Sequence, residues 1–445
     1  MLKRQDREPG ARRRRRAHLT GAPTAPRGGP VAAAVEPAPW ASVLVVSGSV
    51  GAGHDGAANE LARRLRALGV HVDVEDHLAA LVPGAALFLR QGYTQSVGRV
   101  PALFEWLFGV LEDSAFWRFL LALLCRTSGR RMVRWVRRRP YSLVVSTYPL
   151  ASQELGRLRG VGRLRVPVVT YLCDPAAHRS WIHPGVDHHW TVTEATARQG
   201  LRDYGVPMTA VGPLVPERFT QVPAERGAEL RRELGIDPSR RVALLVAGSL
   251  GLGDVEESAA RVGEAGLVPM VLCGRNEELR ARVAAVPGAV ALGWRSDVHE
   301  LLSVADVLVQ NAGGLSYTEA LVAGLPAVSY KCIPGHGRAN AAVLEGARLA
   351  PWARTDAELA PALRTALARG RQRPDLGCPA EAVVGLLVPS DSSPSTADLI
   401  DLTAPRRRDR VLAPLRATRP LRPGRVARAA LVSALLAPVL ARRGG

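Results

Sequence analysis

The same succession of segments occurs once in each half of the chain: a short apolar run, a glycine-rich turn and a stretch of helical periodicity. The first apolar run covers residues 43–46, and the turn after it ends in Gly51-Ala52-Gly53-His54. In the second half the run covers residues 242–246 and the turn covers residues 248–253. Short apolar runs bounded by glycine favour buried parallel strands, with helices as the crossovers between them. The pattern predicts an α/β fold with an open parallel sheet in each half.

Further apolar runs extend both sheets, and a distinct segment separates them. Residues 213–240 contain four prolines and many charges, which favours a linker. The sequence therefore predicts two Rossmann-like domains, residues 41–212 and 241–372, that face a central cleft in the GT-B arrangement. Ligands of such sheets bind at the carboxyl ends of the strands. The additional strands are expected at residues 70–74, 142–146, 166–171, 189–192, 268–273, 290–293, 307–310 and 327–330.

The two ends of the chain differ from this pattern. Residues 1–40 are rich in arginine, proline and alanine and lack periodicity, which predicts a disordered basic leader. Residues 373–445 are predicted to be a low-complexity tail with a short amphipathic segment at 425–443. That segment is too short to span a bilayer. It suits either the plane of a membrane interface or packing on the protein itself.

The charge of the chain points to a polyanionic partner. It has 59 lysine and arginine residues against 40 aspartate and glutamate residues, a formal net charge of +19. Such a charge favours an anionic membrane surface or a nucleic acid. No recognised nucleic-acid-binding motif is present, so a specific nucleic acid partner is disfavoured. The alternative is that the basic segments at the two ends are disordered and have no binding role, and they account for part of the excess positive charge.

Cysteine usage and hydropathy indicate the compartment. The five cysteines include no CxxC pair, so neither a zinc site nor a disulfide framework is expected. No run approaches the roughly 18 apolar residues of a spanning helix, and no apolar stretch follows the basic N-terminus as in a secretory signal. We expect a cytoplasmic protein that is peripheral to the inner face of the cell membrane.

The first glycine-rich turn is a candidate anion site. Gly51 and Gly53 allow a ligand to approach the backbone, and a helix N-terminus favours negative charge. The spacing is not G-x-G-x-x-G, so a dinucleotide cofactor is disfavoured. His54 stands at the mouth of the predicted helix, where it can serve as a general base. A purely structural histidine is the alternative.

The second half holds a denser set of candidates. Gly313 and Gly314 open a predicted helix whose free N–H groups can bind a diphosphate. Glu319 lies about one turn inside that helix, where its carboxylate can accept both hydroxyls of a ribose. The alternative is an ordinary surface or capping carboxylate. The turn with Gly248 and Ser249 is a further candidate for the nucleotide, and residues 333–340 gather hydrogen-bonding groups suited to a sugar.

An aromatic and basic segment lies between the second and third predicted strands. Residues 87–124 contain many large apolar or aromatic side chains with basic residues between them, among them Arg90, Arg99 and Arg118. Such a composition suits an interfacial surface that admits a lipid headgroup. Packed core helices are the alternative.

Several stretches resemble, in the same order, glycosyltransferase family 28, and within it the monogalactosyl- and processive diacylglycerol glycosyltransferases. The resemblance covers roughly residues 42–350. The matching stretches are Gly51 to His54, Ser146 to Leu150, Cys173-Asp174 to Asp187, Cys273 to Asn276, Gly293 to Pro326 and Pro334 to Ala341. Tyr148 replaces the usual histidine of the family. Two further departures leave the donor sugar open: Gln-Asn-Ala-Gly-Gly stands where the lipid-glycosylating members often have K-P-G-G, and Gly337-Arg338 stands where they often have acidic residues.

The resemblance implies an activity. A member of this family would transfer a hexose from a UDP-sugar to a lipid acceptor such as diacylglycerol, with inversion at the anomeric carbon. No metal and no cofactor besides the UDP-sugar co-substrate would be needed. The alternatives are a GT-B glycosyltransferase for a soluble acceptor, a UDP-sugar epimerase, and a basic membrane- or nucleic-acid-binding protein without enzymatic activity.

The resemblance also suggests roles for residues. His54 would take the proton of the acceptor hydroxyl, and Asp174 would orient His54 or bind the acceptor. The N-terminus at Gly313 and Gly314, with Arg275, would stabilise the leaving diphosphate. We expect Glu319 to hold the ribose. Asn340 is expected to hold the sugar.

Overall fold

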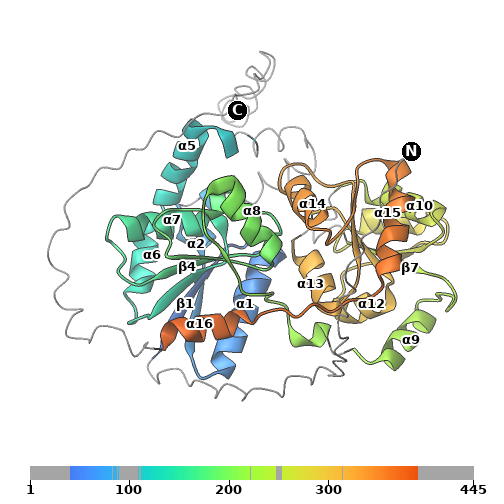
Figure 1. Cartoon of the computed structure of the whole chain (residues 1–445), viewed down its shortest axis with the longest axis horizontal. Coiled ribbons are helices and arrows are strands. Elements are labelled where there is room, and N and C mark those ends of the chain that lie inside the picture. The colour runs from blue at the N-terminus through green and yellow to red at the C-terminus, as the bar shows by residue number, and fades with distance from the viewer. Residues whose placement is uncertain are drawn as a thin grey trace, which may run out of the picture. The chain divides into compact units, whose positions relative to one another are not determined.

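The computed structural model describes residues 41–82, 84–87, 89, 109, 112–220, 222–246, 253–312 and 314–388. Within them the chain forms two six-stranded parallel sheets with helices on both faces (Figure 1). The predicted leader (1–40), the amphipathic segment at 425–443 and most of residues 87–111 lie outside the described residues. None of the described helices is long and apolar enough to cross a membrane.

The first sheet has the order β2-β1-β3-β4-β5-β6. Its strands are β1 (Ser42–Ser47), β2 (His71–Asp76), β3 (Leu143–Ser146), β4 (Val168–Leu172), β5 (His188–Thr191) and β6 (Thr209–Ala210). The accompanying helices are α1 (Ala52–Ala67), α2 (His77–Ala80), α5 (Ala115–Arg126), α6 (Gly129–Val136), α7 (Pro149–Gly160), the 3-10 helix η1 (Arg179–Trp181) and α8 (Glu194–Tyr204).

The second sheet has the order β12-β11-β10-β7-β8-β9. Its strands are β7 (Val242–Val246), β8 (Val268–Leu272), β9 (Val290–Leu292), β10 (Val307–Gln310), β11 (Ala327–Tyr330) and β12 (Trp352–Ala353). Its helices are η2 (Glu217–Phe219), α9 (Ala224–Glu233), α10 (Val255–Glu264), α11 (Glu277–Ala284), α12 (Val298–Val304), α13 (Leu315–Ala323), α14 (His336–Gly346) and α15 (Asp356–Arg369).

Inner strands such as β1 and β7 are apolar along nearly their whole length because both faces of each sheet are covered, whereas the edge strand β2 alternates with polar residues. In β1, Val43 and Val45 enter one core cluster, with α1, while Leu44 and Val46 enter another, with α6 and α7. Alternate residues of β7 divide between two clusters in the same way. Successive side chains of a strand point to opposite faces, so a doubly covered strand needs apolar residues at every position. Every predicted strand is present within one or two residues, whereas the two-residue strands β6 and β12 were not predicted.

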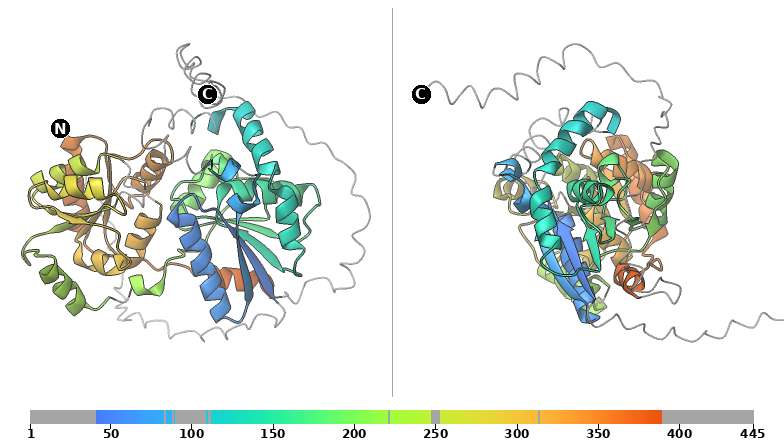
Figure 2. Two further views of the ribbon diagram at one scale, coloured as in Figure 1. Left: turned by 180° about the vertical axis from the view of Figure 1, so that it is seen from behind. Right: turned by 90° about the vertical axis from the view of Figure 1, so that its left-hand side faces the viewer.

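Two segments outside the predicted domains are folded into them. Residues 213–240, expected as a linker, contribute Phe219, Leu230 and Ile236 to the core of the second domain. Helix α16 (Pro379–Leu387) lies in the segment expected as a tail, yet Val383 and Leu387 pack in the core of the first domain beside α1 (Figures 1 and 2). The chain thus returns to the first domain after completing the second.

This return depends on a close backbone approach. Gly212 has a φ of +93°, and a Cβ at this residue would come within 2.0 Å of the carbonyl oxygen of Gly377. Only glycine tolerates both the left-handed conformation and the contact. The backbone at Gly212 and the backbone at Gly377, two residues before α16, can therefore lie in direct contact.

Candidate active site

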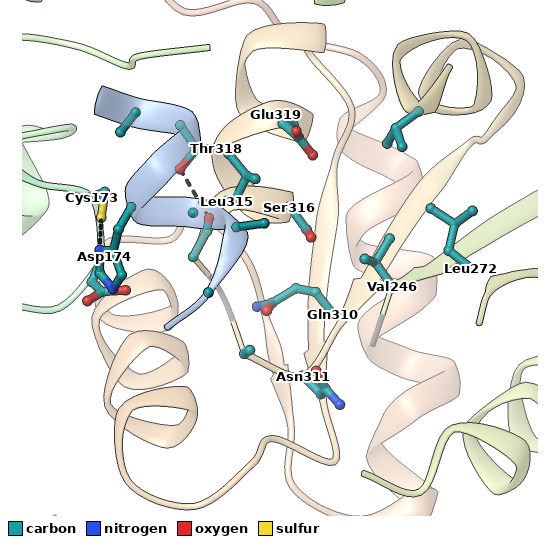
Figure 3. Close-up of a pocket in the computed structure, with 18 of the residues that line it drawn as sticks. Cys173, Asp174, Val246, Leu272, Gln310, Asn311, Leu315, Ser316, Thr318 and Glu319 are labelled. Atoms are coloured by element: carbon teal, nitrogen blue, oxygen red, sulfur yellow. Dashed lines mark hydrogen bonds between the residues drawn. The ribbon is translucent and has the colours of Figure 1, made fainter. Parts of the chain in front are cut away.

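A cavity of about 410 Å³ lies where residues of both domains meet, beyond the carboxyl ends of the central strands. Its first-domain wall includes His54 and Asp174, and its second-domain wall includes Gly314 and Glu319. Figure 3 shows Cys173 and Asp174 on one side of this space and Ser316 and Glu319 on the other. The structure thus brings together residues that are distant in sequence, as the predicted arrangement of two facing sheets requires.

Two carboxylates hold the turn between β1 and α1 through hydrogen bonds from serine hydroxyls. Ser47 Oγ donates to Asp55 Oδ1 at 2.5 Å, and Ser49 Oγ donates to Asp76 Oδ2 at 2.5 Å. Helix α1 begins after Gly51 without any side-chain cap. Because a Cβ at Gly51 would meet nothing within 4 Å, the space over this helix N-terminus is open to a ligand.

Three helix N-termini converge on the cavity. They belong to α1, to α13 after Gly314, and to α14, whose first residue is His336. Each presents unsatisfied N–H groups and a partial positive charge, the arrangement that binds phosphate oxygens. Gly313, Gly248 and Ser249, predicted for the same purpose, lie outside the described residues.

His54 is oriented by a main-chain carbonyl. Its Nδ1 atom lies 2.8 Å from the carbonyl oxygen of Thr147, and Cys173 Sγ lies 3.2 Å from the same nitrogen. Since a carbonyl only accepts, Nδ1 carries the hydrogen and Nε2 of the neutral ring keeps a free lone pair. Burial lowers the pKa of His54, with the charge of Asp174 opposing this effect. The ring is therefore neutral at physiological pH and suited to accept a proton.

Asp174 is held as an anion at the centre of a histidine cluster. Trp181 Nε1 donates to its Oδ2 at 3.1 Å, and His178 Nε2 lies 3.7 Å from the same oxygen. Burial alone would raise the pKa of Asp174, but His178 and the charges of His54 and His336 outweigh it and hold the pKa well below its usual range. The Thr147 carbonyl provides the hydrogen bond to His54, so Asp174 acts on His54 through its charge.

Glu319 lines the second-domain wall with its carboxylate unengaged. Among the described residues none donates a hydrogen bond to it, and burial raises its pKa to about 8, with Arg218 opposing weakly. The residue is partly exposed to the cavity, so its carboxylate can accept hydrogen bonds from a ligand with hydroxyl groups.

Trp294 lines the cavity but was not predicted from the sequence as a site residue. Its side chain lines the cavity and is 54% exposed, and the guanidinium carbon of Arg275 lies 4.6 Å from its ring centroid. Arg275, predicted to contact the diphosphate, does not line the cavity but stacks on this ring. The sequence signal that could have identified Trp294 was its position directly after the strand predicted at residues 290–293.

Asn340 lies behind the cavity wall. The residue is 1% exposed and does not line the cavity. Its Oδ1 accepts from the main-chain nitrogen of Ala176 at 2.9 Å, and its Nδ2 donates to the carbonyl oxygen of Ala312 at 2.8 Å. Both ends of the amide are engaged by protein, so this placement does not offer Asn340 to a sugar.

Residues 54–214 match the model of the monogalactosyldiacylglycerol (MGDG) synthase family. The processive diacylglycerol beta-glucosyltransferase of Bacillus subtilis (strain 168) is 24% identical over 315 residues, which cover 68% of this chain and 81% of that protein. The protein of the same name from Bacillus cereus (strain 03BB102) is 26% identical over 339 residues, covering 71% and 83%.

A solved structure agrees on the fold. The chain is similar to spinosyn rhamnosyltransferase SpnG complexed with thymidine diphosphate, with a TM-score of 0.50 and 13% identity, over 78% of this chain and 99% of that one. With two parallel six-stranded sheets, the fold is GT-B. The family match and the two bacterial relatives confirm the resemblance to the monogalactosyldiacylglycerol synthase-like members of glycosyltransferase family 28 that the ordered motifs predicted.

Proposed function

We propose that this protein is an inverting glycosyltransferase that moves a hexose from a UDP-sugar to the hydroxyl group of a diacylglycerol-like lipid at the cytoplasmic face of the membrane. One observation carries the proposal: a neutral histidine on one wall of the cavity faces the N-termini of α13 and α14 and the carboxylate of Glu319 on the other. A base opposite a diphosphate site is the arrangement that direct displacement requires.

The reaction is a single displacement. The acceptor oxygen attacks the anomeric carbon as the bond from that carbon to the diphosphate oxygen breaks. Nε2 of His54 takes the acceptor proton, and the ionised Asp174 nearby stabilises the imidazolium that forms. Attack from the side opposite the leaving group inverts the anomeric configuration.

The second domain holds the leaving nucleotide. The N–H groups at the start of α13, after Gly314, stabilise the negative charge that develops on the diphosphate. Glu319 accepts hydrogen bonds from the ribose hydroxyls, and the exposed face of Trp294 stacks on the base. These groups supply the charge stabilisation without a bound metal ion, and no cofactor other than the UDP-sugar takes part.

The lipid acceptor is supported by the relatives and by the surface of the first domain. The two Bacillus relatives are named diacylglycerol glucosyltransferases. Helix α5 exposes Phe116, Phe119 and Leu123, while the adjoining α6 exposes Arg130 and Arg134. An apolar face beside arginines suits the interface of an anionic membrane.

The test is transfer by the purified full-length chain. UDP-glucose, UDP-galactose and UDP-GlcNAc are offered separately with diacylglycerol in phosphatidylglycerol vesicles, with and without EDTA, and the anomeric configuration of the glycolipid is determined by NMR. A β-linked glycolipid from an α-linked donor, formed equally with EDTA, is expected. Transfer only to soluble alcohols would contradict the lipid assignment, and an α-linked product would contradict inversion.

A further inference from the structure

The side chain of Asn340 joins the main chains of the two domains at the active site. Its Oδ1 accepts from Ala176 of the first domain, and its Nδ2 donates to the carbonyl of Ala312 in the second. Ala312 belongs to the turn that leads into α13, and Ala176 lies two residues after Asp174. One buried amide therefore links the backbone beside the ionised carboxylate to the backbone beside the diphosphate site.

Residues 175–177 are hydrogen-bonded both to their own domain and to the second domain. Within the first domain, Thr196 Oγ1 donates to the carbonyl of Pro175 at 2.7 Å. Gln199 bonds both main-chain groups of Ala177, at 2.7 Å to its nitrogen and 3.0 Å to its oxygen. Of these bonds, the one from Ala176 to Asn340 crosses to the second domain and therefore depends on the separation of the domains.

On the second-domain side the position of Asn340 is fixed locally. A Cβ at Gly337, one turn earlier in α14, would come within 2.8 Å of the carbonyl oxygen of Asn311. Helix α14 is thus packed directly against the turn at residues 311–312, and the bond to Ala312 joins groups of the same domain. When the domains separate, Asn340 moves with α14 and the amide of Ala176 is left unpaired.

We propose that Asn340 is a positioning residue that holds the two walls of the cleft at their closed separation. This proposal rests on the transferase function proposed above. The bond to Ala176 forms only when the His54 and Asp174 wall stands at its working distance from the α13 wall. Its loss leaves a buried donor without an acceptor and shifts the equilibrium toward open forms. In the proposed function the groups that bind the nucleotide, namely the N-terminus of α13, Glu319 and Trp294, belong to the second domain, so closure and nucleotide binding can be measured separately.

The test compares Asn340→Ala, Asn340→Asp and the matched variant Gln199→Ala, which loosens the same segment from the first-domain side only. For Asn340→Ala we expect kcat to fall about 10- to 100-fold, the range for a small misplacement of reacting groups. The Kd for UDP is expected to change by no more than about twofold, because the bond to Ala312 that is also lost lies behind the cavity wall, while the α13 N–H groups, Glu319 and Trp294 are retained. The ratio of UDP-sugar affinity to UDP affinity also stays unchanged. Hydrogen exchange of the peptide containing Ala176 becomes faster, and Asn340→Asp, which keeps an acceptor, restores part of the protection.

Small-angle scattering provides a measure that does not need turnover. Asn340→Ala is expected to increase the radius of gyration of the free protein relative to wild type, whereas Gln199→Ala leaves it unchanged. Unchanged scattering and unchanged exchange at Ala176 in Asn340→Ala would overturn the proposal. A selective loss of UDP-sugar affinity relative to UDP would also overturn it, in favour of a direct sugar contact. If the wild type transfers no sugar, the transferase function fails while scattering and exchange still decide the role of Asn340 in closure.

Discussion

The Nδ1 atom of His54 lies 2.8 Å from the main-chain carbonyl oxygen of Thr147. Because the main-chain carbonyl cannot be altered by a side-chain substitution, the orientation of the ring depends on the position of β3 and the turn after it. This contact leaves Nε2 as the basic nitrogen.

Replacing His54 with alanine removes the proposed base. We expect kcat to fall about 10²- to 10⁴-fold, the usual contribution of general base catalysis, with little change in the Kd for UDP. His71→Ala is the control, since this histidine is on β2 with an exposed side chain. Steady-state kinetics with vesicle-borne diacylglycerol measure both. A His54→Ala enzyme with near-wild-type kcat would exclude His54 as the base.

The pH dependence of kcat/KM should follow the same histidine. The base works when unprotonated, so activity rises as pH increases through its pKa, which burial lowers below the usual 6.5. The acid limb of the profile should therefore be complete below neutral pH. Asp174 raises this pKa, so Asp174→Asn should move the limb to lower pH. A shift to higher pH would contradict the electrostatic link between the two residues.

Glu319 should make UDP binding pH-dependent. Its pKa is raised to about 8 by burial, and the ionised form is the better acceptor for ribose hydroxyls. UDP affinity should weaken by up to about tenfold per pH unit below 8, and binding should release a proton. Calorimetry in buffers of different ionisation enthalpy measures both effects. Affinity that is flat between pH 6 and pH 9 would contradict the ribose contact.

The same carboxyl should lower stability at alkaline pH. Between its usual pKa of 4.5 and the folded value of about 8, the folded protein retains a proton that the unfolded chain has released. Stability contributed by this group is therefore lost as pH rises through that window. Glu319→Gln, measured by thermal unfolding at pH 5 and pH 8.5, should lose less stability between the two than wild type. An equal loss would argue against the raised pKa.

Trp294 should report nucleotide binding. Base stacking on an aromatic ring contributes about 1–3 kcal/mol, so Trp294→Ala should weaken UDP binding by about 5- to 150-fold. Binding of UDP should also quench tryptophan fluorescence in wild type and less so in the variant. Trp352, which likewise stacks on an arginine but does not line the cavity, provides the control as Trp352→Ala. Equal effects of both substitutions would contradict a stacking role.

The exposed face of α5 should govern membrane binding. Phe116 and Phe119 are 62% and 56% exposed. Replacing both with glutamate should reduce co-sedimentation with phosphatidylglycerol vesicles by at least about tenfold without affecting UDP binding. Leu201→Glu on α8 is the matched control, because Leu201 is 57% exposed. Unchanged sedimentation of the double variant would place the membrane contact elsewhere.

The architecture was largely predictable because its signals are local. Apolar runs and glycine-rich turns identified ten of the twelve described strands, since inner parallel strands that are covered on both faces are mostly apolar, but they did not identify the two-residue strands β6 and β12. The glycine-rich turns after strands then located His54, Gly314 and Glu319, and the family resemblance located Asp174. The structure brings all four residues to one cavity. Helix α16 was missed although Ala380, Val383, Val384 and Leu387 have helical spacing, because a short isolated run gives no indication of the surface that it covers.

The sequence by itself determined the two βα-repeats, the glycine turns and the types of side chain at the strand ends, because each depends on neighbours within a few residues. The tertiary structure decided which of these groups are engaged. The bond between His54 and Thr147 spans 93 positions, and the bond between Ala176 and Asn340 spans 164. Partners so far apart are selected by how the sheets pack, so the basic nitrogen of His54, the stacked position of Arg275 and the buried position of Asn340 emerge only from the folded chain.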